Sequence, residues 1–200
     1  MFGKLGRPAE DRLARQSEIY EAVSPLILEI GVRRLSMRMA ARASYLSVGG
    51  LYHHFATKRA LVLYGLQPDA ITRRCQIFHD EYDHLATSDP VQYLNAGLDS
   101  LSNTVLFVRP AFQAALELGI ETFNSVLQVS IATAGDSFTV ALQNAFPDLG
   151  EDDLYQMGRS AIRAIMSALL DKGITVQEFR SELSALMDGY FARQESATIE

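Results

Sequence analysis

Residues 36–58 read SMRMAARASYLSVGGLYHHFATK, and the rest of the N-terminal region is organised around this stretch. Its first half spaces apolar residues at i, i+3 and i+4, which predicts one buried helix face. Tyr45-Leu46 then marks a turn, and Ser47 can cap a second helix by accepting a free backbone N–H. The next residues, Val48-Gly49-Gly50, carry little side-chain bulk, so this helix start can approach a DNA groove closely. Two short helices with the second N-terminus exposed predict a helix-turn-helix motif.

Cap residues on either side of the motif predict where its helices begin. Ser36 precedes the first helix, and Thr57 precedes a third helix that starts at Lys58. Lys58 and Arg59 then lie in a first helical turn, where the helix dipole disfavours cations. A phosphate bound at that helix end would explain them, because free N–H groups there bind anions.

Charge is distributed unevenly along the 200 residues, whose net charge is −6. Residues 1–60 hold ten Lys or Arg against five Asp or Glu, a net +5, so the remaining residues carry −11. A basic N-terminal quarter on an acidic body is typical of a nucleic-acid-binding module joined to another kind of domain, because phosphate neutralisation supplies most of the affinity for DNA. A solvated charged surface explains the charge pattern equally well by itself.

Composition predicts a soluble cytoplasmic protein. Cys75 is the single cysteine, so no internal disulfide can form, which fits a reducing compartment. The N-terminus lacks the apolar core of a signal peptide, and no run approaches the ~18 uninterrupted apolar residues of a membrane helix. We therefore expect neither export nor a membrane partner.

Hydrophobic periodicity predicts an all-α fold throughout. A helix from Glu10 should end at Gly31 and bend at Pro25. The helix from Lys58 should bend or break at Pro68 and resume through Asp83. Further helices are predicted from Pro90, with Pro110 ending or restarting the run, from Glu121 to Phe146, from Asp152 to Lys172, and after the capping box that runs from Thr175 to Glu178.

A set of residues within 7–63 resembles the DNA-binding signature of the tetracycline-repressor (TetR) family of bacterial transcription regulators. One departure is Tyr45, where the family has glycine at a turn that favours a left-handed conformation. The alternatives here are a distorted turn, or a Tyr45 side chain that packs or contacts DNA. The resemblance implies an all-α protein with a helix-turn-helix DNA-binding domain at 1–60 and a helical ligand-binding and dimerisation domain at 61–200. The matching residues are Gly31, Ser36, Met37, Arg38, Ala41, Leu46, Ser47, Gly49, Leu51, Tyr52, His54, Phe55 and Lys58.

The resemblance also implies how DNA is bound. The residues implied to contact backbone phosphates are Ser36, Arg38, Tyr52 and Lys58. The residues implied to face the DNA groove are Ser47, Val48, Gly49, Gly50 and His53. From the residues themselves, Lys4 and Arg7 form a basic arm that can reach phosphates or a minor groove. For His53 the alternative is an exposed residue without a role.

Two further sets of residues are predicted from the helices after residue 90. An apolar face on the last two helices predicts a dimer interface, with burial inside one chain as the alternative: Met157, Ala161, Ile165, Ala168, Leu183, Met187 and Tyr190. Aromatic and methionine side chains predict a pocket for an apolar or aromatic effector, with plain core as the alternative: Tyr93, Phe107, Phe112, Phe123, Phe138 and Met166.

A rival hypothesis is an all-helical metal-binding enzyme. Cys75, His79 and Asp83 share one helix face at i, i+4 and i+8, and zinc takes three or four such ligands. Glu81-x-x-His84 has the spacing of a di-iron carboxylate motif, but such sites need two of these motifs and the chain has no second one. The common enzyme motifs are missing as well, so we expect no enzyme, no cofactor and no metal. A protein-interaction module is a third possibility. The favoured hypothesis is a dimeric transcription regulator that represses from a palindromic double-stranded DNA operator until a small molecule releases it.

Overall fold

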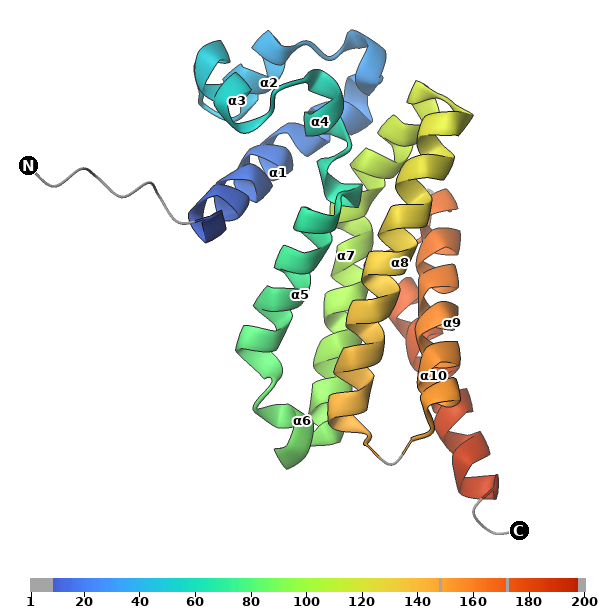
Figure 1. The fold of residues 1–200 in the computed structure, drawn as a ribbon. Helices are drawn as coiled ribbons and strands as arrows, with labels where there is room; N and C mark the ends of the chain where they lie inside the picture. The colour runs from blue at the N-terminus through green and yellow to red at the C-terminus, as the bar shows by residue number, and fades with distance from the viewer. Residues whose placement is uncertain (1–8, 148, 172, 198–200) are drawn as a thin grey trace, which may run out of the picture. The chain divides into compact units, whose positions relative to one another are not determined.

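The structure, a computed structural model, describes residues 9–147, 149–171 and 173–197, with only the backbone described at 9–11 and 190–197. These residues form helices and connecting turns, and the described part of the chain contains no strand (Figure 1). The all-α prediction is confirmed. The helices are α1 (Ala9–Arg34), α2 (Met37–Ala43), α3 (Val48–His54), α4 (Lys58–Val62), the 3-10 helix η1 (Tyr64–Leu66), α5 (Pro68–Tyr82), α6 (Leu85–Ser88), α7 (Pro90–Leu118), α8 (Ile120–Ala145), α9 (Glu151–Leu170) and α10 (Val176–Ala197).

The described residues fall into two compact units. The first combines the chain up to residue 73 with 109–128, and the second combines 74–108 with 129–197. Helices α5, α7 and α8 therefore each contribute residues to both units. The domain boundary after residue 60 remains a prediction, since the first unit also takes in the end of α7 and the start of α8.

Aromatic side chains from α1, η1 and the end of α3 form the core of the first unit. The ring of Tyr64 lies 5.6 Å from that of Tyr20 and 5.5 Å from that of Phe55, measured between centroids. The buried Tyr20 hydroxyl accepts the N–H of Ala111 at 3.0 Å, which fixes α1 to α7. Burial raises the pKa of Tyr20 and raises that of Tyr64 to about 12, so both phenols stay neutral and structural at physiological pH.

Helix α1 continues through Pro25, and only Gly31 departs from helical dihedral angles, with φ of 74°. The predicted end at Gly31 is confirmed, because this left-handed conformation is the usual helix stop. The space beside Gly31 is filled by Glu117 of α7. A Cβ at Gly31 would lie 2.9 Å from a Glu117 carboxylate oxygen, and the same carboxylate accepts the N–H of Val32 at 2.8 Å.

The helix predicted to run from Lys58 to Asp83 is interrupted earlier than its proline alone suggested. It ends at Val62, a 3-10 turn occupies Tyr64–Leu66, and α5 restarts with Pro68 as its first residue. Proline is favoured at that position because its missing N–H would be unsatisfied anyway. Helix α7, by contrast, continues through Pro110 without a break.

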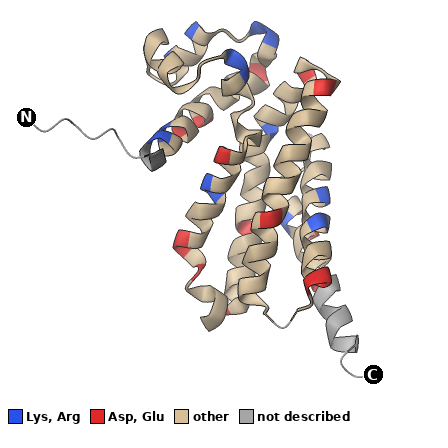
Figure 2. Cartoon of the chain, viewed as in Figure 1, with Lys and Arg blue, Asp and Glu red and all other residues tan. Residues whose placement is uncertain are grey.

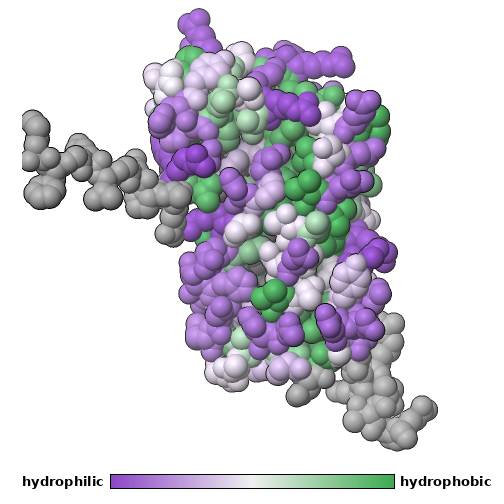
Figure 3. Space-filling view, in the orientation of Figure 1, coloured by the Kyte–Doolittle hydropathy of each residue, from purple (hydrophilic) through white to green (hydrophobic). Residues whose placement is uncertain are grey.

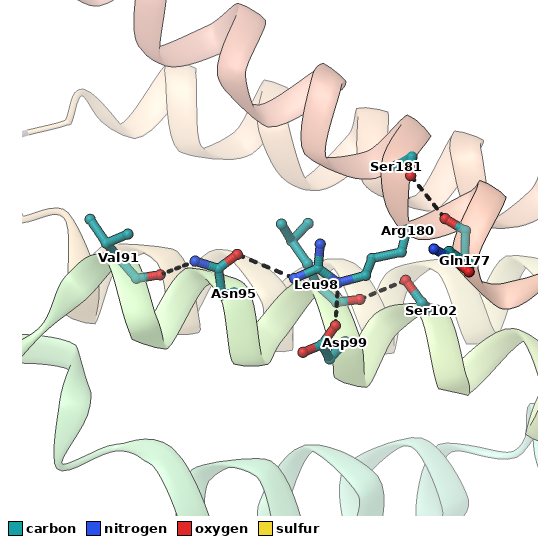
Figure 4. Close-up of polar contacts among 8 residues, drawn as sticks. All are labelled: Val91, Asn95, Leu98, Asp99, Ser102, Gln177, Arg180 and Ser181. Atoms are coloured by element: carbon teal, nitrogen blue, oxygen red, sulfur yellow. Dashed lines mark hydrogen bonds and ion pairs between the residues drawn. The ribbon is translucent and has the colours of Figure 1, made fainter.

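Helix α10 of the second unit begins with the predicted capping box. The Thr175 hydroxyl accepts the N–H of Glu178 at 3.2 Å, and the Glu178 carboxylate accepts the N–H of Thr175 at 2.9 Å. One turn further on, Arg180 attaches α10 to α7 by donating to the Asp99 carboxylate and, at 3.2 Å, to the Asn95 carbonyl oxygen (Figure 4). The box and this contact fix the start and docking of α10.

Hydrophobic side chains reach the surface in several places (Figure 3). On α8 they include Val129, Ile131 and Val140, which are between 38% and 52% exposed. By length and hydropathy alone α8 would suffice to cross a membrane, with 11% of its most apolar window buried, and one such helix is weak evidence for a membrane segment. Apolar surface of this kind is also what a partner subunit covers.

Candidate nucleic-acid interface

Hydroxyl caps set the start of all three short helices in the N-terminal motif. The Ser36 hydroxyl accepts the N–H of Met39 at 3.2 Å, the Ser47 hydroxyl accepts that of Gly50 at 3.0 Å, and the Thr57 hydroxyl accepts that of Ala60 at 3.0 Å. Each bond satisfies one of the free N–H groups of a helix N-terminus. The three caps were predicted from sequence and are confirmed.

The turn between α2 and α3 is closed by two backbone bonds that together form a Schellman motif. Leu46 donates its N–H to Ala41 at 2.8 Å, and Tyr45 donates to Arg42 at 3.2 Å. Tyr45 adopts φ of 56° and is the only non-glycine residue with positive φ in the described chain. Two helices joined by this tight turn form the predicted helix-turn-helix.

Helix α3 divides into a buried and an exposed face. Leu51 is fully buried, whereas Val48 is 40% and Tyr52 48% exposed, and His53 is also exposed. A Cβ built at Gly49 would meet no atom within 4 Å. The first turn of α3 therefore presents bare backbone and small side chains outward, as close approach to DNA requires.

The stretch of chain that contains α2, α3 and α4 carries basic residues and no acidic ones. Residues 30–68 contain six Lys or Arg and no Asp or Glu, a net charge of +6 with histidine neutral. Figure 2 shows this run of the ribbon, from α2 to α4, with Lys and Arg and no acidic residue. Arg33, Arg34, Arg38 and Arg42 are all exposed. Such a patch attracts polyanions and provides the phosphate neutralisation that DNA binding needs.

Exposure permits three of the predicted phosphate contacts, which remain predictions. Ser36, Arg38 and Tyr52 are exposed on this surface, while Lys4 and Arg7 lie outside the described residues. Lys58 also makes hydrogen bonds within the protein that were not predicted from the sequence. Its ammonium donates to the carbonyls of Val32 and Leu35 at 2.9 and 3.0 Å, which leaves one N–H for any phosphate.

Sequence reasoning counted Arg33, Arg34 and Arg42 in the basic N-terminal quarter but did not assign them to the DNA-binding surface. For Tyr45 it left open a distorted turn, packing or contact with DNA. The exposure of the three arginines to DNA could have been predicted, because they lie in a run of the sequence that contains no Asp or Glu. For Tyr45 the sequence marked an unusual turn residue, whereas its 97% exposure depends on the fold.

Helix α4 also contacts the α7–α8 junction. Arg59 donates to the Thr122 hydroxyl at 2.9 Å. Together with the bond from Val32 to Glu117, this contact joins the motif to the end of α7 and the start of α8 within the first unit. A displacement of either helix end would therefore act directly on α1 and α4.

The aromatic residues predicted to line one pocket pack in separate places. Tyr93 lies in a core cluster with Ala86 and Ala145, and burial raises its pKa to about 12, assisted by the nearby Asp83 carboxylate. Phe112 and Phe123 pack on one another in the first unit, with centroids 5.2 Å apart. The second unit also holds Phe107 beneath the guanidinium of Arg74 at 4.7 Å, and the half-buried Phe138 and Met166. The pocket remains a prediction.

Most residues of the predicted dimer interface are buried within a single chain, which was the alternative to an interface. Met157, Ala161, Ala168, Leu183 and Met187 are each at most 2% exposed within a single chain, so they have no surface to offer a partner.

The small residues of α9 serve the chain's own packing. A Cβ at Gly158 would lie 3.2 Å from the Thr139 hydroxyl oxygen of α8. Ile165 is half-buried, and the side chain of Tyr190 lies outside the described residues.

The Cys75–His84 segment does not assemble a metal site. Among the described residues, no three His, Cys, Asp or Glu side chains come together to hold a metal ion. His79 instead pairs its Nδ1 with Asp83 at 2.8 Å, and burial raises the pKa of the Cys75 thiol, which makes it a poor nucleophile. The rival hypothesis of a metal-binding enzyme has no support from this geometry.

Comparison with known proteins agrees with the geometry of the motif. Residues 19–64 match the family described as bacterial regulatory proteins, tetR family. No sequence among curated proteins matches the chain.

Solved structures share the fold at low sequence identity. A TetR-family transcriptional regulator from Rhodococcus sp. is 18% identical with a TM-score of 0.59, covering 88% of this chain and 97% of its own. A transcriptional regulator of the TerR/AcrR family from Aquifex aeolicus VF5 is 19% identical with a TM-score of 0.58, covering 87% and 98%. A SmeT–triclosan complex is 16% identical with a TM-score of 0.56, covering 90% and 91%.

Proposed function

We propose that the chain, whose residues 19–64 match the tetR family of bacterial regulatory proteins, is a dimeric repressor that a small molecule releases from a palindromic operator. The observation that carries the proposal is the exposed first turn of α3, which lies within a run of residues, 30–68, that holds six Lys or Arg and no Asp or Glu. No enzymatic role is proposed, and DNA as the partner places the protein in the cytoplasm.

In this proposal α3 enters the major groove and α2 lies against the phosphates. Ser36, Arg38 and Tyr52 hold the backbone, with Lys58 contributing its remaining N–H, and the arm that carries Lys4 and Arg7 adds charge. Ser47, Val48, Gly49, Gly50 and His53 face the bases. Because this face has few bidentate donors, thymine methyl contacts and DNA shape contribute to base discrimination.

Effector release is proposed to act through the contacts between α4 and α8. An effector shifts the protein only if it binds the DNA-releasing conformation more tightly than the other. The bonds from Arg59 to Thr122 and from Val32 to Glu117 give such a shift a path to α4 and α1. The SmeT–triclosan complex supports an aromatic ligand. Because the predicted lining residues pack in separate places, one effector would contact only some of them: Tyr93, Phe107, Phe112, Phe123, Phe138 and Met166.

A homodimer is proposed because a palindrome requires two recognition helices about 34–36 Å apart. Since the inner face of α9 is buried in its own chain, its outer face is the one available to a partner. Tyr155 is 52% and Leu170 66% exposed, and the half-buried Met166 shares their side of the helix by spacing.

Selection of bound sequences from random DNA duplexes tests the proposed function. We expect a palindrome with half-sites about one helical turn apart. Recovery of no enriched sequence at low salt would contradict the proposal, and enrichment of a single half-site would contradict the dimer.

Two substitutions separate affinity from specificity. Arg38→Ala should weaken binding to every duplex and lower the slope of log affinity against log salt by about 1, because one phosphate contact is lost. His53→Ala should instead change which bases are enriched in the selection. An unchanged salt slope for Arg38→Ala would remove Arg38 from the interface.

A further inference from the structure

The α2–α3 turn holds a tyrosine in a conformation that favours glycine. Tyr45 lies at the C′ position of the Schellman motif, where its N–H bonds Arg42 and the next N–H bonds Ala41. Its φ of 56° places the Cβ against the neighbouring backbone, which L-residues adopt at a cost. A glycine would satisfy the same two bonds without that cost.

The tyrosine side chain is too exposed for packing within the protein to offset this strain. It is 97% exposed, the most exposed large hydrophobic residue in the described chain. Backbone strain that packing does not explain indicates a functional position. The ring must therefore be retained for something outside the protomer.

The surroundings of Tyr45 indicate what that partner is. Tyr45 lies two residues before Ser47, the cap of α3, and between exposed Arg42 and exposed Val48. Residues 12–73 have five exposed large hydrophobic side chains, and four of them lie between Met39 and Tyr52 in the motif. Aromatic rings in a run that has arginines and no acidic residue suit a polyanion and repel a basic protein surface.

We propose that Tyr45 is a DNA-contacting residue that extends the footprint of α3 beyond its first turn. Its ring packs against the sugar-phosphate backbone at the edge of the half-site, and its hydroxyl donates a hydrogen bond to a phosphate oxygen. A tyrosine bond to phosphate fixes the register of the motif on the duplex. Because the phenol is neutral, this contact releases no counterion and leaves the salt dependence of binding unchanged.

Three variants of the full-length protein test the inference, which rests on the proposed function. Tyr45→Phe removes only the hydroxyl and should lower affinity for the selected duplex about tenfold with an unchanged salt slope. Tyr45→Gly removes the ring and the strain, so it should lower affinity at least as much while raising Tm by about 2–4 °C. Tyr82→Phe, which deletes a phenol hydroxyl on α5 of the second unit, is the matched control and should match the wild type.

Opposite changes in Tm and DNA affinity for Tyr45→Gly distinguish a DNA contact from a structural residue. Wild-type affinity in both Tyr45 variants would overturn the inference and leave the proposed function standing. A lower Tm for Tyr45→Gly would overturn it too, because the ring would then be packing within the protein. Failure of the wild type to enrich any duplex would overturn the proposed function and this inference with it.

Discussion

At the residue scale, the missing Cβ of Gly49 should determine how closely α3 can approach DNA, and substitution of Gly49 tests this. Its added Cβ would meet nothing in the protein, so Gly49→Ala should stabilise the helix by about 0.5–1 kcal/mol. The same methyl would intrude between α3 and the groove, so operator affinity should fall about tenfold or more. Urea unfolding and a gel shift on one preparation measure both quantities.

Gly50 would be a poor choice for the same experiment, since its Cβ would lie 3.2 Å from the Ser47 hydroxyl that caps α3. Full operator affinity in a stabilised Gly49→Ala variant would show that the first turn of α3 stays clear of the groove.

At the scale of the element, the end of α1 is held by one glycine and one carboxylate. Gly31→Ala should lower the free energy of unfolding by about 2–4 kcal/mol, through left-handed strain and through displacement of Glu117 from the N–H of Val32. In a Glu117→Ala background the same substitution should cost only about 1–2 kcal/mol, because the strain alone remains. Urea denaturation of the four proteins gives the coupling energy.

Gly189→Ala on α10 is the control for that cycle, since a Cβ there meets no atom within 4 Å and should stabilise by about 0.5–1 kcal/mol. Equal costs of Gly31→Ala in both backgrounds would show that Glu117 does not sense the substitution.

Elements whose ends are encoded by local chemistry were predictable from sequence. The caps Ser36, Ser47 and Thr57, the stop at Gly31 and the capping box at Thr175 act within a few residues, so their patterns are legible without the fold. Contacts between residues far apart in the sequence were not predictable in this way. The partners of Lys58 are carbonyls 23 and 26 residues away, and Met157 is 1% exposed within a single chain, which its helical spacing alone could not distinguish from burial against a second copy.

At the scale of the whole molecule, the outer face of α9 carries the proposed dimer. Leu170→Asp places a charge on a side chain that is 66% exposed in one chain, so the protomer should keep its stability within about 0.5 kcal/mol. In a dimer the same charge would be buried without a partner, which is strongly unfavourable. Sedimentation should therefore show a monomer, and affinity for the palindrome should fall while binding to a single half-site persists.

Val91→Asp on α7 is the matched control, because Val91 is 68% exposed and lies on a helix outside the proposed interface. A Leu170→Asp variant that stays dimeric would direct attention to α8, whose exposed Val129, Ile131 and Val140 offer the alternative apolar face. Monomeric protein that still binds the palindrome at wild-type affinity would contradict the link between dimerisation and operator recognition, since two tethered recognition helices gain affinity over one through effective concentration.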